Sequence, residues 1–207
     1  MPSLPNKDLP SRIHTPKSYF EPLPLNSLFE QQQPLEVEIG CGNGSFLVNY
    51  AEENQKTNFI GIERLLGRIR KLDRKTSRRG LMNVAIVRVE AAYGIQYMLP
   101  PASVQAYHIY FPDPWPKRKH WKNRLIEPGF LPLLSKSLST DGKVYLRTDN
   151  TDYFEQMEET FAGDSAFERI KAPDSLTQIV TDFEKTFNAQ GIPTLRAQYR
   201  LRKSGSN

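Results

Sequence analysis

A short apolar segment followed at once by a glycine turn is the feature that most constrains the fold of this chain. The stretch EVEIGCGNG places glycines at 40, 42 and 44 directly after residues 35–39, which predict a buried strand. Glycines at such a turn let the backbone approach a ligand that a side chain would repel. Ser45 is a plausible cap for a helix over 46–54. The pattern predicts a strand, a turn and a helix, and the turn either binds a ligand or only connects the two elements.

Strands and helices continue to alternate along the chain. Further strands are predicted at 58–62, 84–89, 104–110 and 143–146, and helices at 65–79, around 125–139 and at 152–162. The final stretch TLRAQYRLR alternates apolar and polar residues with the period of a half-exposed strand. We therefore expect an α/β fold with a mostly parallel sheet, helices on both faces and a final antiparallel strand.

Residues 1–34 differ in composition from the rest of the chain. They hold seven of the 16 prolines and end in three consecutive glutamines before Pro34. Proline lacks a backbone donor and disrupts regular helices and central strands, so this stretch is predicted to be an extended arm. Residues 35–207 are long enough for one domain with a full core.

Charge and cysteine content narrow the class of protein. Lysine and arginine outnumber the acids 28 to 23, a net charge of +5, which favours a polyanionic partner. Cys41 is the only cysteine, so we expect no disulfide framework, and a reducing cytoplasm is the simplest location. The three histidines are widely spaced and predict no metal site. Neither a signal-like stretch nor an apolar run of about 18 residues predicts contact with a membrane.

Three acids lie at or near the ends of consecutive predicted strands: Glu38, Glu63 and Glu90. A carboxylate at Glu63 can accept both hydroxyls of a ribose, and Glu90 can reach an adenine edge. Glu38, two residues before Gly40, suits an ammonium or sulfonium group and would repel a pyrophosphate. The set favours S-adenosylmethionine over a nicotinamide cofactor.

The stretch FPDPWPKRKHWKNR, residues 111–124, follows the predicted strand 104–110. Its prolines restrict the turn around Asp113, which lies beyond the carboxyl end of the strand, where open α/β sheets place their ligands. Five cations follow (Lys117, Arg118, Lys119, Lys122 and Arg124), with aromatic residues among them. Such a group suits a nucleic-acid backbone and stacked bases, and the alternative is a solvated loop.

A second group of cations falls on the predicted helix 65–79. Arg64, Arg68, Lys71, Lys75 and Arg78 are spaced by four, three, four and three residues, which places them on one helical face. A separate apolar stripe, which includes Leu65, is expected to face the core. The cationic face is either solvated or a track for RNA phosphates.

The ordered motifs VEIGCGNG, FIGIER, FPDPWPKRKHWKNRL, LRTDN and TDFEKTFNAQG resemble those of the bacterial tRNA (guanine-N7-)-methyltransferases. The resemblance extends from residue 35 over nearly the whole remaining chain. It implies a Rossmann-like class I methyltransferase fold and methyl transfer from S-adenosylmethionine to N7 of a guanine in the tRNA variable loop (position 46). An oligomeric state of monomer or homodimer stays open.

Site residues carry over from the resemblance by position. It implies cofactor contacts by Glu38, Gly40, Glu63, Glu90 and Asp113, with Asp113 also the catalytic residue. It further implies contacts with tRNA, listed here: Lys117, Asp149, Thr181, Asp182, Phe183 and Glu184. Glu90 stands where the family usually has aspartate or asparagine. Two other functions remain as alternatives: an RNA-binding module without catalysis, and a nicotinamide-dependent oxidoreductase.

Overall fold

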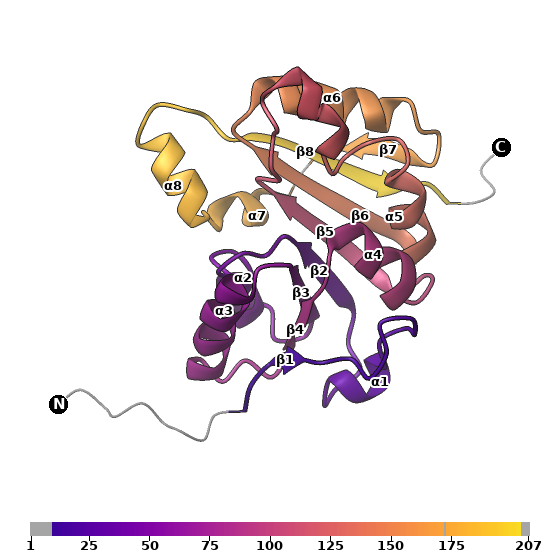
Figure 1. Cartoon of the computed structure of the whole chain (residues 1–207), viewed down its shortest axis with the longest axis vertical. Helices are drawn as coiled ribbons and strands as arrows, with labels where there is room; N and C mark the ends of the chain where they lie inside the picture. Colours follow the sequence, from indigo (N-terminus) through magenta and orange to yellow (C-terminus); the bar gives the residue numbers. More distant parts are fainter. Residues whose placement is uncertain (1–9, 172, 204–207) are drawn as a thin grey trace.

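The predicted first strand forms as β2 (Leu35–Ile39) and lies near the middle of an eight-stranded sheet (Figure 1). The computed structural model describes residues 10–171 and 173–203. The strand order is β1-β4-β3-β2-β5-β6-β8-β7, and β8 alone runs antiparallel to its neighbours. The other strands are β1 (Ile13–His14), β3 (Asn58–Glu63), β4 (Val84–Arg88), β5 (Val104–Tyr110), β6 (Leu138–Thr148), β7 (Phe167–Ile170) and β8 (Leu195–Leu201). The mostly parallel sheet with a late antiparallel strand is confirmed.

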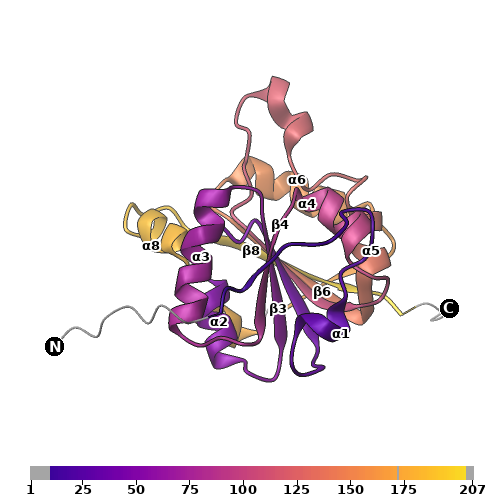
Figure 2. The same cartoon turned by 60° about the horizontal axis from the view of Figure 1, so that its bottom comes forward.

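Helices cover both faces of the sheet (Figures 1 and 2). One face carries α2 (Leu47–Glu53), α3 (Leu66–Arg78), α7 (Asp174–Gln178) and α8 (Asp182–Asn188). The other face carries α1 (Leu25–Leu28), α4 (Ala91–Tyr93) with the π-helical turn η1 (Gly94–Met98), α5 (Leu131–Ser137) and α6 (Thr151–Ala162). A 3-10 helix, η2 (Arg118–Asn123), lies in the loop after β5.

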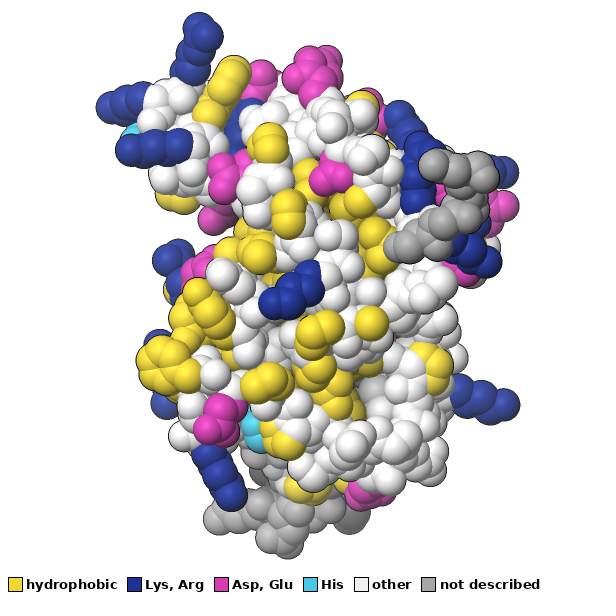
Figure 3. All heavy atoms as spheres, turned by 90° about the vertical axis from the view of Figure 1, so that its right-hand side faces the viewer, with side chains coloured by type: hydrophobic (Ala, Val, Ile, Leu, Met, Phe, Trp, Pro, Cys, Tyr) yellow, Lys and Arg dark blue, Asp and Glu magenta, His cyan; other side chains and the backbone are white. Residues whose placement is uncertain are grey.

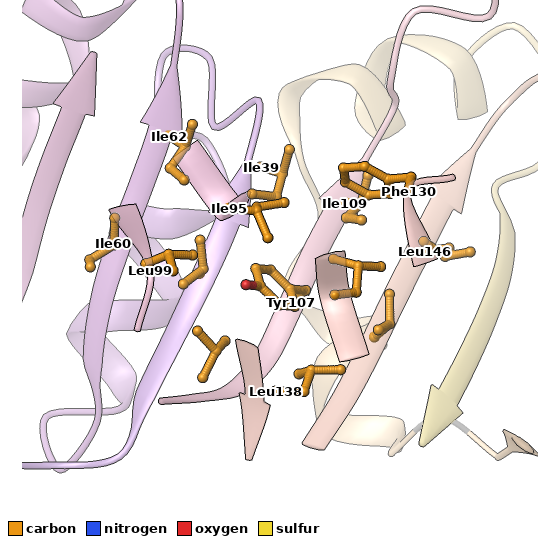
Figure 4. Packing of buried hydrophobic residues seen from close by; sticks show 14 of the residues in the cluster. Ile39, Ile60, Ile62, Ile95, Leu99, Tyr107, Ile109, Phe130, Leu138 and Leu146 are labelled. Carbon is orange, nitrogen blue, oxygen red and sulfur yellow. The ribbon is translucent and has the colours of Figure 1, made fainter. Parts of the chain in front are cut away.

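The largest core cluster lies between the sheet and the layer of α1, η1, α5 and α6 (Figure 4). Tyr107 lies at its centre with no exposed surface, and its hydroxyl hydrogen-bonds Ser137 at 2.6 Å. Each large apolar side chain buried in this way contributes about 1.5–3 kcal/mol to folding. This layer holds the strands rigid, so that their carboxyl ends can present side chains in fixed positions.

The opposite face of the central strands is polar. Strand register aligns Glu38 with His108, His108 with Tyr145, and Tyr110 with Arg147. The His108 ring hydrogen-bonds both Glu36, at 2.7 Å, and the Tyr110 hydroxyl, at 2.8 Å. Buried polar groups of this kind need partners, and here they supply them to one another.

Several boundaries differ from the sequence predictions. Phe46, not Ser45, is the N-cap residue of α2, and no side chain caps that end. The predicted helix around 125–139 is limited to α5 (Leu131–Ser137), because Pro128 and Gly129 interrupt it. The strand predicted at 143–146 is longer, and Asp141 in it has a φ of +60°.

The described part of the predicted arm, residues 10–34, packs against the domain. Its β1 pairs with the edge strand β4, and Leu23 and Phe29 are buried in the largest core cluster. The short strand and α1 were not predicted, because their stability comes from these tertiary contacts and not from local sequence pattern. The division of the chain at residue 34 stays a prediction.

We expect Gly44→Ala to lower the free energy of unfolding by about 2–5 kcal/mol. Gly44 has a φ of +74°, and a Cβ there would lie 2.2 Å from Cδ1 of the fully buried Leu72. Gly80→Ala is the matched control, since Gly80 has a φ of +64° but open space around it. The control should lose only about 1–2 kcal/mol in urea unfolding. Equal losses in both variants would show that the contact between α2 and α3 does not depend on this glycine.

Candidate functional site

A cleft of about 320 Å³ lies at the carboxyl ends of the central strands. Its volume falls at the lower end of the range for small-molecule sites. The segments that follow β2, β3, β4 and β5 each contribute to its walls. These include Gly40 after β2, Glu63 to Leu65 after β3, Glu90 and Ala91 after β4, and Phe111 to Asp113 with Trp115 after β5. Of the predicted cofactor residues, the structure brings Gly40, Glu63, Glu90 and Asp113 together in the cleft wall, whereas Glu38 is not in it.

The glycine turn gives the cleft an open backbone wall. Gly40 has a φ of +70°, and a Cβ built on it would meet no atom within 4 Å. The turn is fixed from behind, since the N–H groups of Gly40 and Cys41 donate to the Ile62 carbonyl at 2.8 and 3.1 Å. A bound molecule can therefore lie directly against the main chain at this position.

Glu63 is nearly buried and organises the neighbouring backbone. Its carboxylate accepts hydrogen bonds from the N–H groups of Arg64 (2.7 Å), Leu65 (2.9 Å) and Gly42 (3.2 Å). The Arg68 guanidinium lies 3.6 Å away. The acid therefore joins the glycine turn to the start of α3, and it also lines the cleft.

Glu90 is the N-cap residue of α4. Its two carboxylate oxygens accept from the Ala92 N–H at 3.1 Å and the Tyr93 N–H at 2.9 Å. Capping of this kind fixes the rotamer of the side chain while leaving its outer surface exposed at the cleft. The glutamate thus has a structural role besides any contact with a ligand.

Glu38 lies beneath the cleft and not in its wall. It is 5% exposed, and its Oε2 has no hydrogen-bond partner among the described residues. Burial raises the pKa of this carboxyl well above its ordinary value, although the Arg147 guanidinium and the Leu47 N–H act to lower the pKa. A buried acceptor without a partner is costly, and a cationic ligand group would relieve that cost.

Arg147 is the residue that connects this buried acid to the rest of the sheet face. Its guanidinium is buried, donates to Glu184 at 2.9 Å and to the Ile179 carbonyl at 2.8 Å, and also donates to the Leu176 carbonyl. It lies 4.2 Å from the ring centroid of Tyr110. One side chain of β6 thereby holds α7 and the start of α8 next to the cleft.

The predicted substrate stretch 181–184 has two buried and two exposed members. Thr181 and Glu184 form a capping box at the start of α8, and Glu184 also binds Arg196 at 2.7 Å. Asp182 and Phe183 are exposed. Thr181 and Glu184 thus shape α8 in this structure, whereas Asp182 and Phe183 are free to meet a partner.

Phe183 is linked to the cleft through an aromatic contact. Its ring stacks on Phe111 at a centroid distance of 5.8 Å, and Phe111 lines the cleft. Phe111 has a φ of +51°, an uncommon conformation for a side-chain-bearing residue, which turns the chain sharply after β5. Phe111 and Arg147 lie within the motifs FPDPWPKRKHWKNRL and LRTDN, but neither was assigned a role from the sequence.

The loop that follows Asp113 projects from the body of the molecule (the rose-coloured loop in Figure 2). Asp113 is exposed at its base, in the cleft wall with Trp115. Four cations of this loop are exposed: Lys117, Arg118, Lys119 and Lys122. Figure 3 shows lysine and arginine side chains gathered on a lobe at the upper left. We name these four residues the η2 cations.

Arg124 does not belong to this exposed group, and the sequence prediction that included it is wrong. It is 3% exposed, and its guanidinium donates to the Pro114 carbonyl at 2.8 Å as well as to Asp152 and Gln156. It also lies 4.5 Å from the ring centroid of Trp121. Its role is to anchor the projecting loop to α6.

Lys117 and Asp149 lie outside the cleft wall. Lys117 is exposed at the start of η2, and Asp149 is half-buried between β6 and α6. Leu65, predicted to face the core, is 45% exposed and lines the cleft instead. The structure thus brings neither Lys117 nor Asp149 into the cleft wall.

Among the described residues, no group of three or more histidine, cysteine, aspartate or glutamate side chains could hold a metal ion. None of the helices that the described residues form is long and apolar enough to cross a membrane.

Comparison with known proteins gives one consistent result. Residues 32–197 match the family described as "Putative methyltransferase". A tRNA (guanine-N(7)-)-methyltransferase of Geobacter metallireducens is 35% identical over 202 residues, which cover 95% of this chain and 93% of that protein. Proteins of the same name from Chromohalobacter salexigens and Thermotoga maritima are 36% and 33% identical over 73% and 89% of this chain. The matches to these two cover only 61% and 59% of their own lengths.

Solved structures give the fold. The 16S rRNA methyltransferase KamB superposes with a TM-score of 0.63 at 11% identity, over 86% of this chain and 92% of its own. An O-methyltransferase of Thermotoga maritima superposes with a TM-score of 0.57, also at 11% identity, over 86% of this chain and 62% of its own. Together with the strand order, these likenesses confirm the Rossmann-like class I methyltransferase fold.

We expect Glu38→Gln to stabilise the free protein at alkaline pH relative to wild type. A carboxyl whose folded pKa is raised binds more protons in the folded state, so its stability contribution is complete below the unfolded pKa and is lost as pH rises through the folded pKa. Urea unfolding at pH 5 and pH 8 measures this, and the advantage of the glutamine variant should grow between the two. A constant difference would show that Glu38 does not titrate with a raised pKa.

Proposed function

We propose, because this chain belongs to the tRNA (guanine-N(7)-)-methyltransferase family, that it transfers a methyl group from S-adenosylmethionine to N7 of a guanine in the tRNA variable loop. The observation that carries the proposal is the cleft in which Gly40, Glu63, Glu90 and Asp113 meet, directly beside the η2 cations. The acids suit a cationic cofactor, and the cations suit a polynucleotide. We also propose that the protein acts in the cytoplasm, where tRNA is modified.

The residues in and beneath the cleft fit the cofactor. Glu38 has the buried unpartnered oxygen that an ammonium group would satisfy, and Gly40 leaves room for a molecule against the backbone. Glu63 would hold the ribose hydroxyls with the lone pairs that its three N–H partners leave, and Glu90 would meet the adenine edge. S-adenosylmethionine supplies a methyl group made electrophilic by its sulfonium.

Guanine N7 needs no base to become a nucleophile. Its in-plane lone pair forms the new N–CH₃ bond while the C–S bond breaks and its electron pair stays on sulfur, so no proton moves. The purine gains positive charge as this happens, and a carboxylate close to it stabilises that charge. Asp113, exposed in the cleft wall, is the residue we assign to this role.

The tRNA contacts we propose surround the cleft. We assign Lys117 and the other η2 cations to phosphates, and Asp149 and Asp182 to polar groups of the nucleotide. Phe183, which stacks on Phe111, offers an aromatic face to a base. Thr181 and Glu184 support these contacts by fixing the start of α8.

The alternatives explain less. A nicotinamide enzyme would place a pyrophosphate at the glycine turn, next to the buried carboxylate of Glu38. An RNA-binding module without catalysis would not need the acids at the strand ends. Transfer of a radiolabelled methyl group from S-adenosylmethionine to unmodified tRNA, followed by mapping of the modified base, tests the proposal. Labelling at a position other than guanine N7, or no labelling, would contradict it.

We expect Asp113→Asn to lower the single-turnover rate of methyl transfer on the order of 10²-fold with cofactor and tRNA saturating. The tRNA dissociation constant should change much less, because the carboxylate acts mainly as charge develops on the purine. Asp149→Asn is the matched control. A saturated rate unchanged in Asp113→Asn but lowered in Asp149→Asn would move the charge-stabilising role to Asp149.

The η2 cations give a second expectation. Lys119→Gln with Lys122→Gln should weaken tRNA binding and reduce the slope of log affinity against log salt by about one to two units, since each phosphate contact contributes roughly 0.7–0.9. Cofactor affinity should stay at the wild-type value, measured by calorimetry. Arg124 is left unchanged because its loss would detach the loop from α6. A wild-type salt slope would show that the η2 cations are only solvated.

A further inference from the structure

The outward surface of α3 carries six cations, and five of them have no carboxylate within 4.0 Å among the described residues. They are Arg68, Arg70, Lys71, Arg74, Lys75 and Arg78, and all but the half-buried Lys75 are exposed. Their spacings put several pairs three or four residues apart, where like charges destabilise a helix by a few tenths of a kcal/mol per pair. We call these six residues the α3 cations.

The only acid of α3 does not face them. Asp73 accepts hydrogen bonds from the Arg12 N–H at 2.6 Å and from the Ser11 hydroxyl at 3.0 Å, so it is occupied by the N-terminal segment. Among the described residues, Glu63 is the one carboxylate within 4.0 Å of an α3 cation, at 3.6 Å from Arg68. The outward surface of α3 therefore carries positive charge with little negative charge near it.

Three arginines elsewhere in the described chain pair with acids, whereas the exposed Arg64, Arg88, Arg118 and Arg202 do not. Arg79, directly after α3, pairs with Glu52 at 2.7 Å, Arg200 pairs with Glu168, and Arg169 pairs with Glu158. Around these three pairs the described surface mixes both signs. The α3 cations depart from that arrangement, which points to a partner that supplies the negative charge.

The α3 cations are continuous with the cleft. Arg68, in the first turn of α3, lines it together with Arg64 and Leu65. The opposite wall holds Trp115 and Asn123, which belong to the projecting η2 loop. In Figure 2, α3 lies to the left of the sheet and the η2 loop projects at the top. The cleft therefore lies between two separate cationic surfaces.

We propose that the α3 cations form a second phosphate-binding surface, so that tRNA crosses the cleft with its backbone held on both sides of the reacting base. This inference rests on the proposed function and adds a contact surface that the cleft residues do not supply. Binding at two separated surfaces fixes the direction of the RNA over the cleft, whereas binding at the η2 cations alone would leave the RNA free to pivot. The α3 cations beyond Arg68 lie away from the reacting atoms, so they affect binding and not the chemical step.

The test uses the triple variant Lys71→Gln, Arg74→Gln and Arg78→Gln in the full chain. We expect tRNA affinity at about 0.15 M salt to fall tenfold or more, and the salt slope to shrink by about two units, because up to three phosphate contacts are lost at roughly 0.7–0.9 each. The matched control is Lys56→Gln, Lys136→Gln and Lys203→Gln. It removes the same formal charge at the edge of the sheet opposite the cleft, where β3 and β6 begin and β8 ends and where Lys203 pairs with Asp141 at 3.2 Å. It should retain nearly the wild-type slope.

Further measurements distinguish a failure of this inference from a failure of the proposed function. The single-turnover rate with saturating tRNA and the cofactor affinity should both match wild type in the α3 variant, and circular dichroism should show an intact fold. If wild type methylates tRNA but the α3 and control variants have equal salt slopes, the α3 surface does not bind tRNA. That result contradicts this inference and leaves the proposed function standing. If wild type methylates no tRNA at guanine N7, the proposed function itself fails.

Discussion

The adjacency of β2 and β5 at the centre of the sheet decides where a ligand can bind in this molecule. From β2 the chain crosses through α2 to β3 on one side, and from β5 it continues through α5 to β6 on the other. Connections that diverge in this way leave the carboxyl ends of the two strands uncovered, and the cleft opens there. Gly40 and Asp113 meet because each follows one of these two strands, although they lie far apart in sequence.

The polar face beneath the cleft imposes a second constraint, which centres on Arg147. Two carboxylates, Glu38 and Glu184, are buried on this face, and a buried charge without a partner costs several kcal/mol. Arg147 interacts with both acids. It binds Glu184 directly, and its charge opposes the rise that burial causes in the pKa of Glu38. The same guanidinium fixes α7 through two carbonyls. The cofactor side and the proposed substrate side of the cleft therefore share one buried cation.

The sequence predicts the features that depend on neighbouring residues and misses those that depend on contacts between distant segments. The strand 35–39 was predicted to the residue. Glu63, Glu90 and Asp113 meet in one cleft because parallel strands bring their carboxyl ends to one edge, whereas Glu38 lies within β2 and outside the cleft wall. Arg124 was misassigned because nothing in a run of cations distinguishes a buried arginine from an exposed lysine. Its partner Asp152 lies 28 residues away in sequence. The place of Arg147 depends on strand register and on the fold of residues 174–188, neither of which a single sequence reveals.

The distribution of charge explains how an acid-lined cleft can serve a polyanion. Glu63 and Glu90 give much of their acceptor capacity to backbone N–H groups, and Glu38 is buried, so the three acids repel an approaching phosphate less than free carboxylates would. Asp113 differs from them, since it is exposed in the cleft wall and has no hydrogen-bond or ion-pair partner within the described ranges. A free carboxylate among cationic surfaces opposes RNA binding to a small extent. That cost is understandable if the carboxylate acts where positive charge develops on the base, because there its uncompensated charge is what the reaction requires.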